Sequence, residues 1–484
     1  MLMSRNHSGN FLRPAHLDAV QGEKQTLGAS QDLERDHAKG LPYPVGDGEV
    51  YDRSVDNYSK GVNKRSNDEM RRVCRSHYDV IVIGGGASGM MAAIRACERG
   101  SSVLLIEKNS ELGKKLSITG GGRCNITNAE FDTRVLLAHY GDAAKFLHSP
   151  FSQFGVQNTF DFFETRGLSL KIEERNRAFP RTESAKDVTR LLKKVALNVG
   201  VTLLLGVEVK SLIQNANVIA GVITNKGTYT ARSVILATGG ASYVETGSTG
   251  EGLSWLKNLG HTVYESSPDI VPLTVKESWV KKLSGKSLAS AQIVFGSGRN
   301  RIQKSGKILF THFGLSGPLI LNASREVKKM LEDGEVKAHI NLFPDIEAYE
   351  LEKRVLNYFE LHKNKTLRNA LKEIVPHGMS DAVLSHIGET LALSKVHSIT
   401  REQRAVLVHA CTALTCTVTG TMGYDWAVVS DGGVDLKEVD MKTMASKLYP
   451  NLYFTGDVLH INRPSGGYSL QLCWTTGWVA GSHA

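Results

Sequence analysis

The sequence predicts an α/β protein in which a parallel-sheet domain is interrupted first by a β-rich and then by a helical insertion. Three neighbouring segments predict the sheet domain. Residues 78–83 form a continuous apolar run typical of strands buried on both faces, residues 87–99 show helical periodicity, and residues 102–107 form a second buried strand. Together they have the size of a strand–helix–strand crossover, about 30 residues, which connects parallel strands.

Changes of pattern along the chain predict where the insertions begin and end. The first 77 residues are polar and lack apolar periodicity, so they cannot bury enough surface to offset the entropy of ordering. Short strands punctuated by Gly and Ser give way to helical periodicity after Pro344, and strand character returns near Asn451. The expected segments are a disordered extension at 1–77, a first part of the sheet domain at 78–265, an inserted β-rich domain at 266–345, an inserted helical subdomain at 346–410, and a return to the sheet domain with a C-terminal helix at 411–484.

The composition of the 484-residue chain excludes several classes of protein. No apolar stretch approaches the roughly 20 residues that a membrane helix needs. The six cysteines are too scattered for a disulfide framework and lack C-x-x-C spacing, which favours a reducing, cytoplasmic location without a metal site. The close pair Cys411 and Cys416 is expected to pack on one helix. The acid-free first 17 residues only weakly resemble an organellar transit peptide, so organellar targeting is the alternative.

A net charge of +9 raises the question of nucleic-acid binding. We do not expect it, because the charges are interspersed and no basic run or aromatic–basic motif stands out. A basic field also suits a protein that handles diphosphates and small anionic substrates. The expected partner is therefore a small-molecule substrate.

A glycine motif carries the strongest functional signal. Residues 84–89 read GGGASG, which fits G-x-G-x-x-G and lies between the first expected strand and helix. Gly84 permits a tight turn, Gly86 lets the backbone approach a pyrophosphate, and Gly89 lets helix and strand pack closely. Glu107 ends the second strand, where a carboxylate accepts hydrogen bonds from ribose hydroxyls. The motif predicts a bound dinucleotide with its phosphates at the helix N-terminus.

Later segments favour FAD over NAD(P). Residues 234–240, VILATGG, form a strand that ends in Thr-Gly-Gly and returns to the same sheet. A further strand ends in Gly456 and Asp457, which supply a carboxylate for a ribityl hydroxyl. Residues 466–468, GGY, then open the last helix, whose N-terminus can stabilise negative charge on a reduced flavin ring. A simple NAD-dependent dehydrogenase has no use for the last two features.

Several longer blocks resemble the BaiN-like (YhiN-like) family of FAD-dependent oxidoreductases, also labelled aminoacetone oxidase family FAD-binding enzymes. The resemblance covers residues 78–484 and rests on YDVIVIGGGASGMMAA, EKNSELGKKLSITGGGRCNITN, ATGGASYVETGSTGEG, FTHFGLSGPLIL, GGVDLKEVD and NLYFTGDVLHINRPSGGYSLQ. It implies a Rossmann-like, glutathione-reductase-like FAD-binding domain interrupted by a β-barrel-like domain and a helical subdomain. The chain departs from the family pattern at Asp457, where many members have Glu, and at Val244, where many have Pro.

The motifs and the resemblance together give a set of expected FAD contacts. The glycine turn, the strand ends and the opening of the last helix follow from the residues themselves. The resemblance implies the loop after the second strand, Val209 beside the adenine, and Gln471 beside the flavin ring. The expected contacts are Gly84, Gly86, Ala87, Ser88, Gly89, Glu107, Lys108, Gly113, Lys115, Leu116, Thr119, Gly120, Gly121, Gly122, Arg123, Cys124, Asn125, Val209, Ala237, Thr238, Gly239, Gly456, Asp457, Gly466, Gly467, Tyr468 and Gln471.

No catalytic residue stands out, and the weak candidates have structural alternatives. Arg123 could approach flavin N5 or a substrate carboxylate, but phosphate or backbone pairing is favoured. Cys124 could be a reactive thiol, but a small buried residue beside the cofactor is favoured. His312 could act as an acid or base, or simply hold a loop in place. Tyr468 is a candidate because the resemblance puts it beside the flavin ring.

These features predict an FAD-dependent oxidoreductase that acts on a small organic substrate by hydride transfer at flavin N5. Only one glycine fingerprint is present, so either NADH or NADPH binds transiently at the flavin face as the donor, or the organic substrate is itself the reductant. Two alternatives stay open: a flavoprotein that modifies tRNA, and a protein whose flavin is not catalytic. Copurifying RNA with salt-sensitive binding distinguishes the first, and a flavin that no reductant reduces distinguishes the second.

Overall fold

The computed structural model describes residues 50–51, 76–297 and 300–484. The expected disordered extension at 1–77 lies outside the described residues except at 50–51 and 76–77. Val50–Tyr51 form strand β1, which pairs antiparallel with Leu204 and Leu203 of the main sheet. This short pairing differs from the sequence expectation, which assigned no strand before residue 78.

The main sheet confirms the expected Rossmann-like domain. Its strands follow the order β1-β7-β3-β2-β10-β9-β8, and β19 pairs with β10. The pairs β7–β3, β3–β2, β2–β10 and β10–β19 are parallel. Burial of these strands explains the apolar runs of β2, β3 and β7 and of the last three residues of β10. The bounds are β2 His77–Ile83, β3 Val103–Glu107, β7 Thr202–Leu205, β8 Val209–Asn215, β9 Val218–Thr224, β10 Gly227–Leu236 and β19 Leu452–Phe454.

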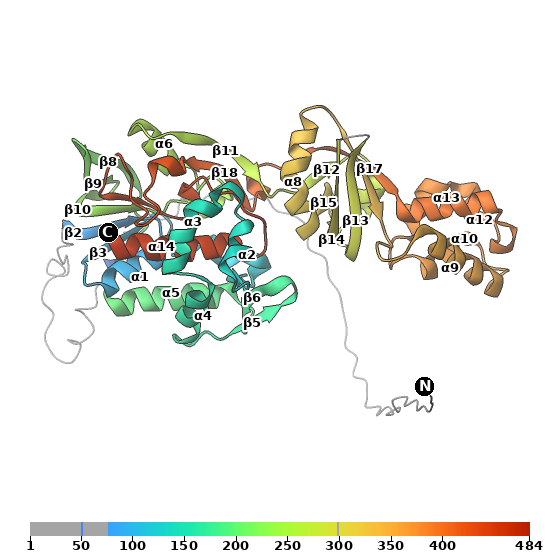
Figure 1. Ribbon diagram of the computed structural model, residues 1–484, viewed down its shortest axis with the longest axis horizontal. Coiled ribbons are helices and arrows are strands. Elements are labelled where there is room, and N and C mark those ends of the chain that lie inside the picture. The colour runs from blue at the N-terminus through green and yellow to red at the C-terminus, as the bar shows by residue number, and fades with distance from the viewer. Residues whose placement is uncertain (1–49, 52–75, 298–299) are drawn as a thin grey trace, which may run out of the picture. The chain divides into compact units, whose positions relative to one another are not determined.

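Helices α1 and α14 lie side by side in this domain (Figure 1). Glycines let them approach, since a Cβ on Gly477 would lie 2.4 Å from the carbonyl oxygen of Ser88 and one on Gly481 2.3 Å from that of Ala92. The expected final helix is confirmed, and its contact with α1 brings the glycine turn and the C-terminal segment together. The bounds are α1 Ala87–Glu98, α5 Ala185–Val199, α6 Glu251–Asn258 and α14 Tyr468–His483.

The chain segment that follows β3 and precedes α5 forms a smaller layer, which was not expected from the sequence. It holds an antiparallel sheet in the order β4-β6-β5 and a group of helices. The strands of two to four residues are too short to show a period, which explains why the pattern did not reveal them. The bounds are β4 Thr127–Asn128, α2 Thr133–Ala138, α3 Ala144–Gln153, α4 Val156–Glu164, β5 Leu170–Glu173 and β6 Arg177–Pro180.

The β-rich insertion is a closed barrel, as expected. Its strands follow the order β12-β15-β14-β13-β16-β17, and β17 pairs with β12 to close it. The assignment of residues 411–484 to the returning FAD-binding domain is wrong for β17. Alternation marks that segment as a strand but does not say which distant strands it joins. The bounds are β12 Leu273–Val275, α7 Ser278–Lys282, β13 Ser287–Ser297, β14 Asn300–Phe310, β15 Gly314–Ser316, α8 Pro318–Leu331, β16 Val336–Asn341 and β17 Leu414–Thr421.

Helices α9 to α13 lie between β16 and β17, and they share one hydrophobic core with the barrel. The expectation that Cys411 and Cys416 lie on one helix is wrong, because α13 ends at Thr412 and Cys416 belongs to β17. Both thiols are buried and free. No helix in the described part of the chain is long and apolar enough to cross a membrane. The bounds are α9 Ala348–Leu361, α10 Leu367–Ile374, α11 Ser380–Ile387, α12 Glu389–Leu393 and α13 Arg401–Thr412.

A two-stranded ribbon of β11 and β18 carries the chain into and out of the insertion. Helix α8 of the barrel contacts both this ribbon and the segment before α14. The guanidinium of Arg325 pairs with Asp269 of β11, and Asn322 Oδ1 accepts hydrogen bonds from Ser465 N at 2.9 Å and Ser465 Oγ at 2.8 Å. The bounds are β11 Val263–Asp269 and β18 Val429–Val434.

Candidate cofactor site

The glycine turn lies at the carboxyl ends of the parallel strands, where its glycines have different environments. Gly84 has a φ of +104°, and a Cβ there would lie 2.5 Å from the carbonyl oxygen of Ala237. A Cβ on Gly89 would lie 1.9 Å from the carbonyl oxygen of Gly84, so Gly89 allows α1 to pack on the turn. A Cβ on Gly86 would meet nothing within 4 Å. Only Gly86 therefore leaves open space, which is the space a diphosphate needs.

Glu107 joins the end of β3 to this turn. Its buried carboxylate accepts hydrogen bonds from Gly85 N at 2.7 Å, from Asn109 N at 2.8 Å and from Asn109 Nδ2 at 2.7 Å. The carboxylate is thus fixed beside the turn. The neighbouring Lys108 points elsewhere, since its Nζ donates to Thr249 Oγ1 at 2.9 Å.

The loop after β3 contains an unusual run of left-handed backbone. Residues 120–122 have φ values of 58°, 67° and 84°, and Cys124 follows with 60°. Glycine adopts such conformations readily, and the glycines at 121 and 122 have nothing within 4 Å of a Cβ position. Asn125 Oδ1 in this loop and Thr238 Oγ1 after β10 are buried without a hydrogen-bond partner. Unpaired buried polar atoms are rare, so both fit a ligand that would complete them.

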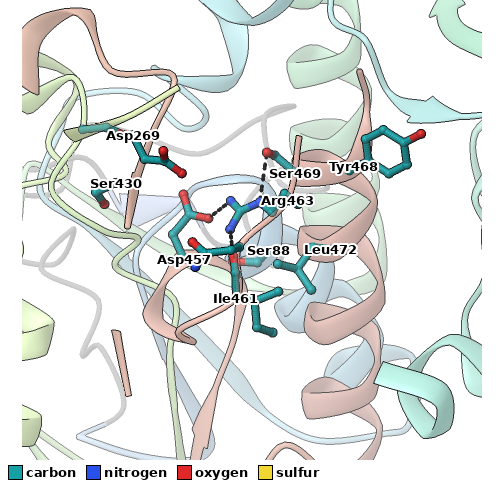
Figure 2. A network of polar contacts seen from close by, with 12 residues as sticks. Ser88, Asp269, Ser430, Asp457, Ile461, Arg463, Tyr468, Ser469 and Leu472 are labelled. Atoms are coloured by element: carbon teal, nitrogen blue, oxygen red, sulfur yellow. Dashed lines mark hydrogen bonds and ion pairs between the residues drawn. The ribbon is translucent and has the colours of Figure 1, made fainter. Parts of the chain in front are cut away.

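A buried charge cluster lies between the end of β19 and the start of α14 (Figure 2). Arg463 pairs with Asp457, and it donates to Ile461 O at 2.7 Å and to Ser469 Oγ at 3.0 Å. Burial disfavours the charge of Asp457, but Arg463 and Lys115 outweigh it and hold the pKa of Asp457 below its usual value. The sequence analysis missed Arg463, although its place between two expected contacts was a signal.

The turn that opens α14 is tightly packed. A Cβ on Gly467 would lie 2.3 Å from the backbone of Thr127, which explains a glycine at this position, where φ is +103°. The side chain of Gln471 is held by other residues of the protein. Gln471 is fully buried, its Oε1 accepts from Thr127 Oγ1 at 2.6 Å and Thr159 Oγ1 at 3.0 Å, and its Nε2 donates to Thr475 Oγ1 at 3.1 Å. These bonds fix the side-chain amide inside the protein.

Residues 78–483 match the family described as HI0933-like protein Rossmann domain. The chain belongs to the HI0933-like family. It is 32% identical over 410 residues to the 3-dehydro-bile acid delta(4,6)-reductase of Clostridium scindens, which covers 83% of this chain and 98% of that protein. It is 28% identical over 402 residues to the ribosomal RNA dihydrouridine synthase of Escherichia coli, which covers 83% of this chain and 96% of that protein. The resemblance drawn from the sequence motifs is confirmed.

Solved structures resemble the HI0933-like chain more weakly. The 3-ketosteroid delta1-dehydrogenase of Sterolibacterium denitrificans is 15% identical, covers 84% of this chain and 99% of its own, and has a TM-score of 0.49. That likeness supports no statement about substrate. The family and the reductase relative identify the chain as an FAD-dependent oxidoreductase.

The residues of this HI0933-like chain fit FAD. The open backbone at Gly86 and the unpaired atoms of Asn125 and Thr238 all lie in segments expected to contact the cofactor. Two further expected residues are buried: Ser88 lies in α1 and is bonded to Thr455, and Val209 lies at the start of β8. Ala87, Gly113, Leu116, Gly239, Gly456 and Gly466 lie in the same turns and strand ends. Within the described ranges, no group of three or more His, Cys, Asp or Glu side chains is placed to hold a metal.

The weak catalytic candidates lie in contrasting environments. Arg123 pairs with Glu173 and Glu183 and stacks on Phe179 at 4.2 Å, so its guanidinium is engaged by carboxylates rather than by backbone. Cys124 is buried, and burial raises its pKa to about 12, which agrees with the favoured reading of an unreactive packed residue.

His312 and Tyr468 complete the set of candidates. His312 is exposed in the barrel turn between β14 and β15, edge-on to Phe313 with ring centroids 4.9 Å apart. Tyr468 opens α14 and packs its ring against His139 at 4.7 Å. Figure 2 shows the ring of Tyr468 turned away from Arg463. Of the two, only Tyr468 belongs to an element of the expected cofactor site.

Proposed function

We propose that FAD lies along the carboxyl edge of the main sheet. The N–H groups at the start of α1 and the open backbone at Gly86 bind the diphosphate, Glu107 binds the adenosine ribose, and Val209 contacts the adenine. The loop of residues 113–125 and Asp457 hold the ribityl chain and the ring. The support is the convergence of these segments at the ends of parallel strands, where open sheets of this kind bind ligands.

The reaction that we propose is the reduction of a carbon–carbon double bond conjugated to a carbonyl group. One observation carries this: relatives that match over nearly their whole length are named for reductions of unrelated molecules, a 3-dehydro-bile acid and uridine in ribosomal RNA. Both names describe saturation of such a bond, so the reaction type belongs to what the relatives share. When bound, FAD supplies the hydride from N5 of its reduced ring, with NADH or NADPH as the donor.

The chain's own residues suit this chemistry. The N-terminus of α14 presents unpaired N–H groups, which favour negative charge on a ring bound there. Tyr468 occupies the first position of this helix, and burial raises its pKa, so its hydroxyl stays protonated at neutral pH. We assign Tyr468 as the donor of the proton that completes the saturation of the double bond.

A second candidate substrate is a uracil base within RNA. It is favoured by the full-length relatives from Escherichia coli and Haemophilus influenzae, both named ribosomal RNA dihydrouridine synthase. The sequence of the insertion also contains a basic stretch that the sequence analysis did not single out. Between residues 276 and 307 Glu277 is the one acidic residue, and the basic residues are Lys276, Lys281, Lys282, Lys286, Arg299, Arg301, Lys304 and Lys307.

Separate measurement of the two half-reactions tests the proposal. The purified holoenzyme is first reduced anaerobically with NADH or NADPH, followed at the flavin absorbance band. The reduced enzyme is then mixed with a 3-oxo-4-ene steroid, with cyclohex-2-enone, or with protein-free ribosomal RNA. We expect an enone to reoxidise the flavin and to gain two hydrogens by mass. Reoxidation by RNA alone selects the second candidate, and reoxidation by none of the three contradicts the proposed reaction.

A further inference from the structure

Arg463 is a charged residue that the expected cofactor site does not account for. Its side chain is only 2% exposed and pairs with Asp457, while its other nitrogens donate to Ile461 O and Ser469 Oγ (Figure 2). Burial of a guanidinium is costly unless its donors are used. Here those donors connect the carboxylate expected at the ribityl chain with the first turn of α14.

A second basic side chain lies near this ion pair. Lys115 acts on Asp457, its Nζ donates to Ser242 Oγ at 3.0 Å, and burial lowers its pKa. The other groups that act on the guanidinium are neutral at physiological pH, because burial raises the pKa of Cys473 to about 12 and raises that of Tyr140 as well. Glu245, which acts on Lys115, is exposed and therefore screened by solvent. Replacement of Arg463 or of Asp457 by a neutral residue therefore changes the charge of the cluster in opposite directions.

We propose that Arg463 is a positioning residue of the flavin site. It fixes Asp457 and keeps positive charge at the start of α14, so that the bound flavin is more easily reduced. A two-electron reduction adds negative charge to the ring, and fixed positive charge in a site of low dielectric constant stabilises the reduced state. The inference rests on the proposed cofactor site, because Asp457 and α14 are assigned to FAD there.

A merely structural role for Arg463 makes a different prediction. If the ion pair only stabilises the fold, removal of either partner should weaken FAD retention and leave the potential of the flavin that remains bound unchanged. If its charge acts on the flavin, removal of Arg463 and removal of the Asp457 charge should shift the potential in opposite directions. The sign of the two shifts therefore separates the roles.

The experiment measures the midpoint potential of the holoenzyme by equilibration with a reference dye, together with the ratio of flavin to protein. The variants are Arg463→Gln, Arg463→Lys and Asp457→Asn. Arg404→Gln serves as the control, because Arg404 is another poorly exposed arginine paired with a glutamate, Glu352, but lies in α13 beside the barrel. Arg404→Gln should leave the potential unchanged.

We expect Arg463→Gln to lower the equilibrium constant for flavin reduction at least tenfold, about 30 mV for a two-electron couple. Asp457→Asn should raise it, and Arg463→Lys, which keeps the charge, should stay within about threefold of the unmodified enzyme. If Arg463→Gln does not retain flavin, Arg463→Lys decides: a tenfold fall in that variant overturns the proposal. An unchanged potential in Arg463→Gln, or shifts of the same sign in Arg463→Gln and Asp457→Asn, also overturns it. Absence of flavin from the unmodified protein would instead overturn the cofactor site itself.

Discussion

Replacement of Gly86 by valine should separate the cofactor role of the glycine turn from its structural role. Position 86 has an extended backbone, with φ of −77° and ψ of −169°, which any residue adopts without strain. A Cβ there would meet nothing within 4 Å, so the valine side chain points into open space. In the proposed complex that space is taken by the diphosphate. Gly86→Val should therefore fold and bind FAD more weakly.

The expected magnitudes follow from the same geometry. Insertion of extra carbon atoms into an occupied space costs about 1–3 kcal/mol or more, which corresponds to about a 5- to 150-fold weaker affinity for FAD. Without FAD, Gly86→Val should change the free energy of unfolding by no more than about 1 kcal/mol, because a poorer N-cap is offset by a less flexible unfolded chain. Gly89→Ala is the contrasting variant. Its Cβ would lie 1.9 Å from a backbone oxygen, so the protein itself should be destabilised.

The assay compares flavin content after purification, FAD affinity by titration of the apoprotein, and urea unfolding of the apoproteins. Comparison of apoproteins is essential, because bound FAD would by itself raise the apparent stability. Gly86→Val should contain less flavin than the unmodified enzyme, bind FAD more weakly in the titration and unfold near normally, whereas Gly89→Ala should unfold at lower urea. A yellow Gly86→Val protein with the flavin content of the unmodified enzyme would refute the assignment of the diphosphate. Equal destabilisation of both apoproteins would refute the division of roles between the glycines.

Other variants test single contacts. Tyr468→Phe should lower turnover about 10²- to 10⁴-fold with the rate of flavin reduction unchanged, and unchanged turnover would remove Tyr468 as the proton donor. Cys124→Ser should keep full activity, because a thiol with a pKa near 12 is protonated; a tenfold loss with FAD retained would contradict this. Gln471→Leu should lower the free energy of unfolding by about 1–3 kcal/mol by leaving its hydroxyl partners unpaired, and a neutral result in urea would show that they find new partners. Arg463 and Lys115 hold the pKa of Asp457 below its ordinary value of 3.8, so the charged carboxylate stabilises the folded protein above that pH and this stabilisation is lost as the pH falls through the lower, folded value. The fraction of FAD released, measured against falling pH, should therefore rise less steeply in Asp457→Asn than in the unmodified enzyme.

The sequence predicts the parts of the fold in which local pattern and tertiary role coincide. Residues 78–83 and 102–107 are buried on both faces of the sheet, so their continuous apolar character identifies them as central parallel strands. Gly89 is required by its contact with Gly84 within the turn, so its role could be predicted from the motif alone, whereas Gly84 is also required by the backbone of Ala237, far along the chain. The resemblance adds the later segments, whose order along the chain places them in the same domain.

The sequence does not predict features that depend on distant partners. The strand β17 joins the barrel because β12 and β16 lie beside it, and its own alternating residues would suit another sheet equally well. Gln471 is polar and close to the opening of α14, which suggests a ligand contact, yet its partners Thr127 and Thr159 come from more than 300 residues earlier. The place of Arg463 between Asp457 and Gly466 indicates that it lies near the site, but nothing local shows that it is buried and paired with Asp457.

The contacts of α8 connect the barrel with the segment that carries Arg463. Arg325 and Asn322 of the barrel bond to Asn462 and Ser465, the residues on either side of Arg463 and its following proline. The segment that carries the buried charge is therefore held from the main sheet on one side and from the insertion on the other. If the insertion contributes the substrate surface, a substrate that shifts α8 acts directly on the segment that orients Asp457 and opens α14. The insertion is then connected to the proposed flavin site through residues 461–466, rather than through the glycine turn assigned to the diphosphate.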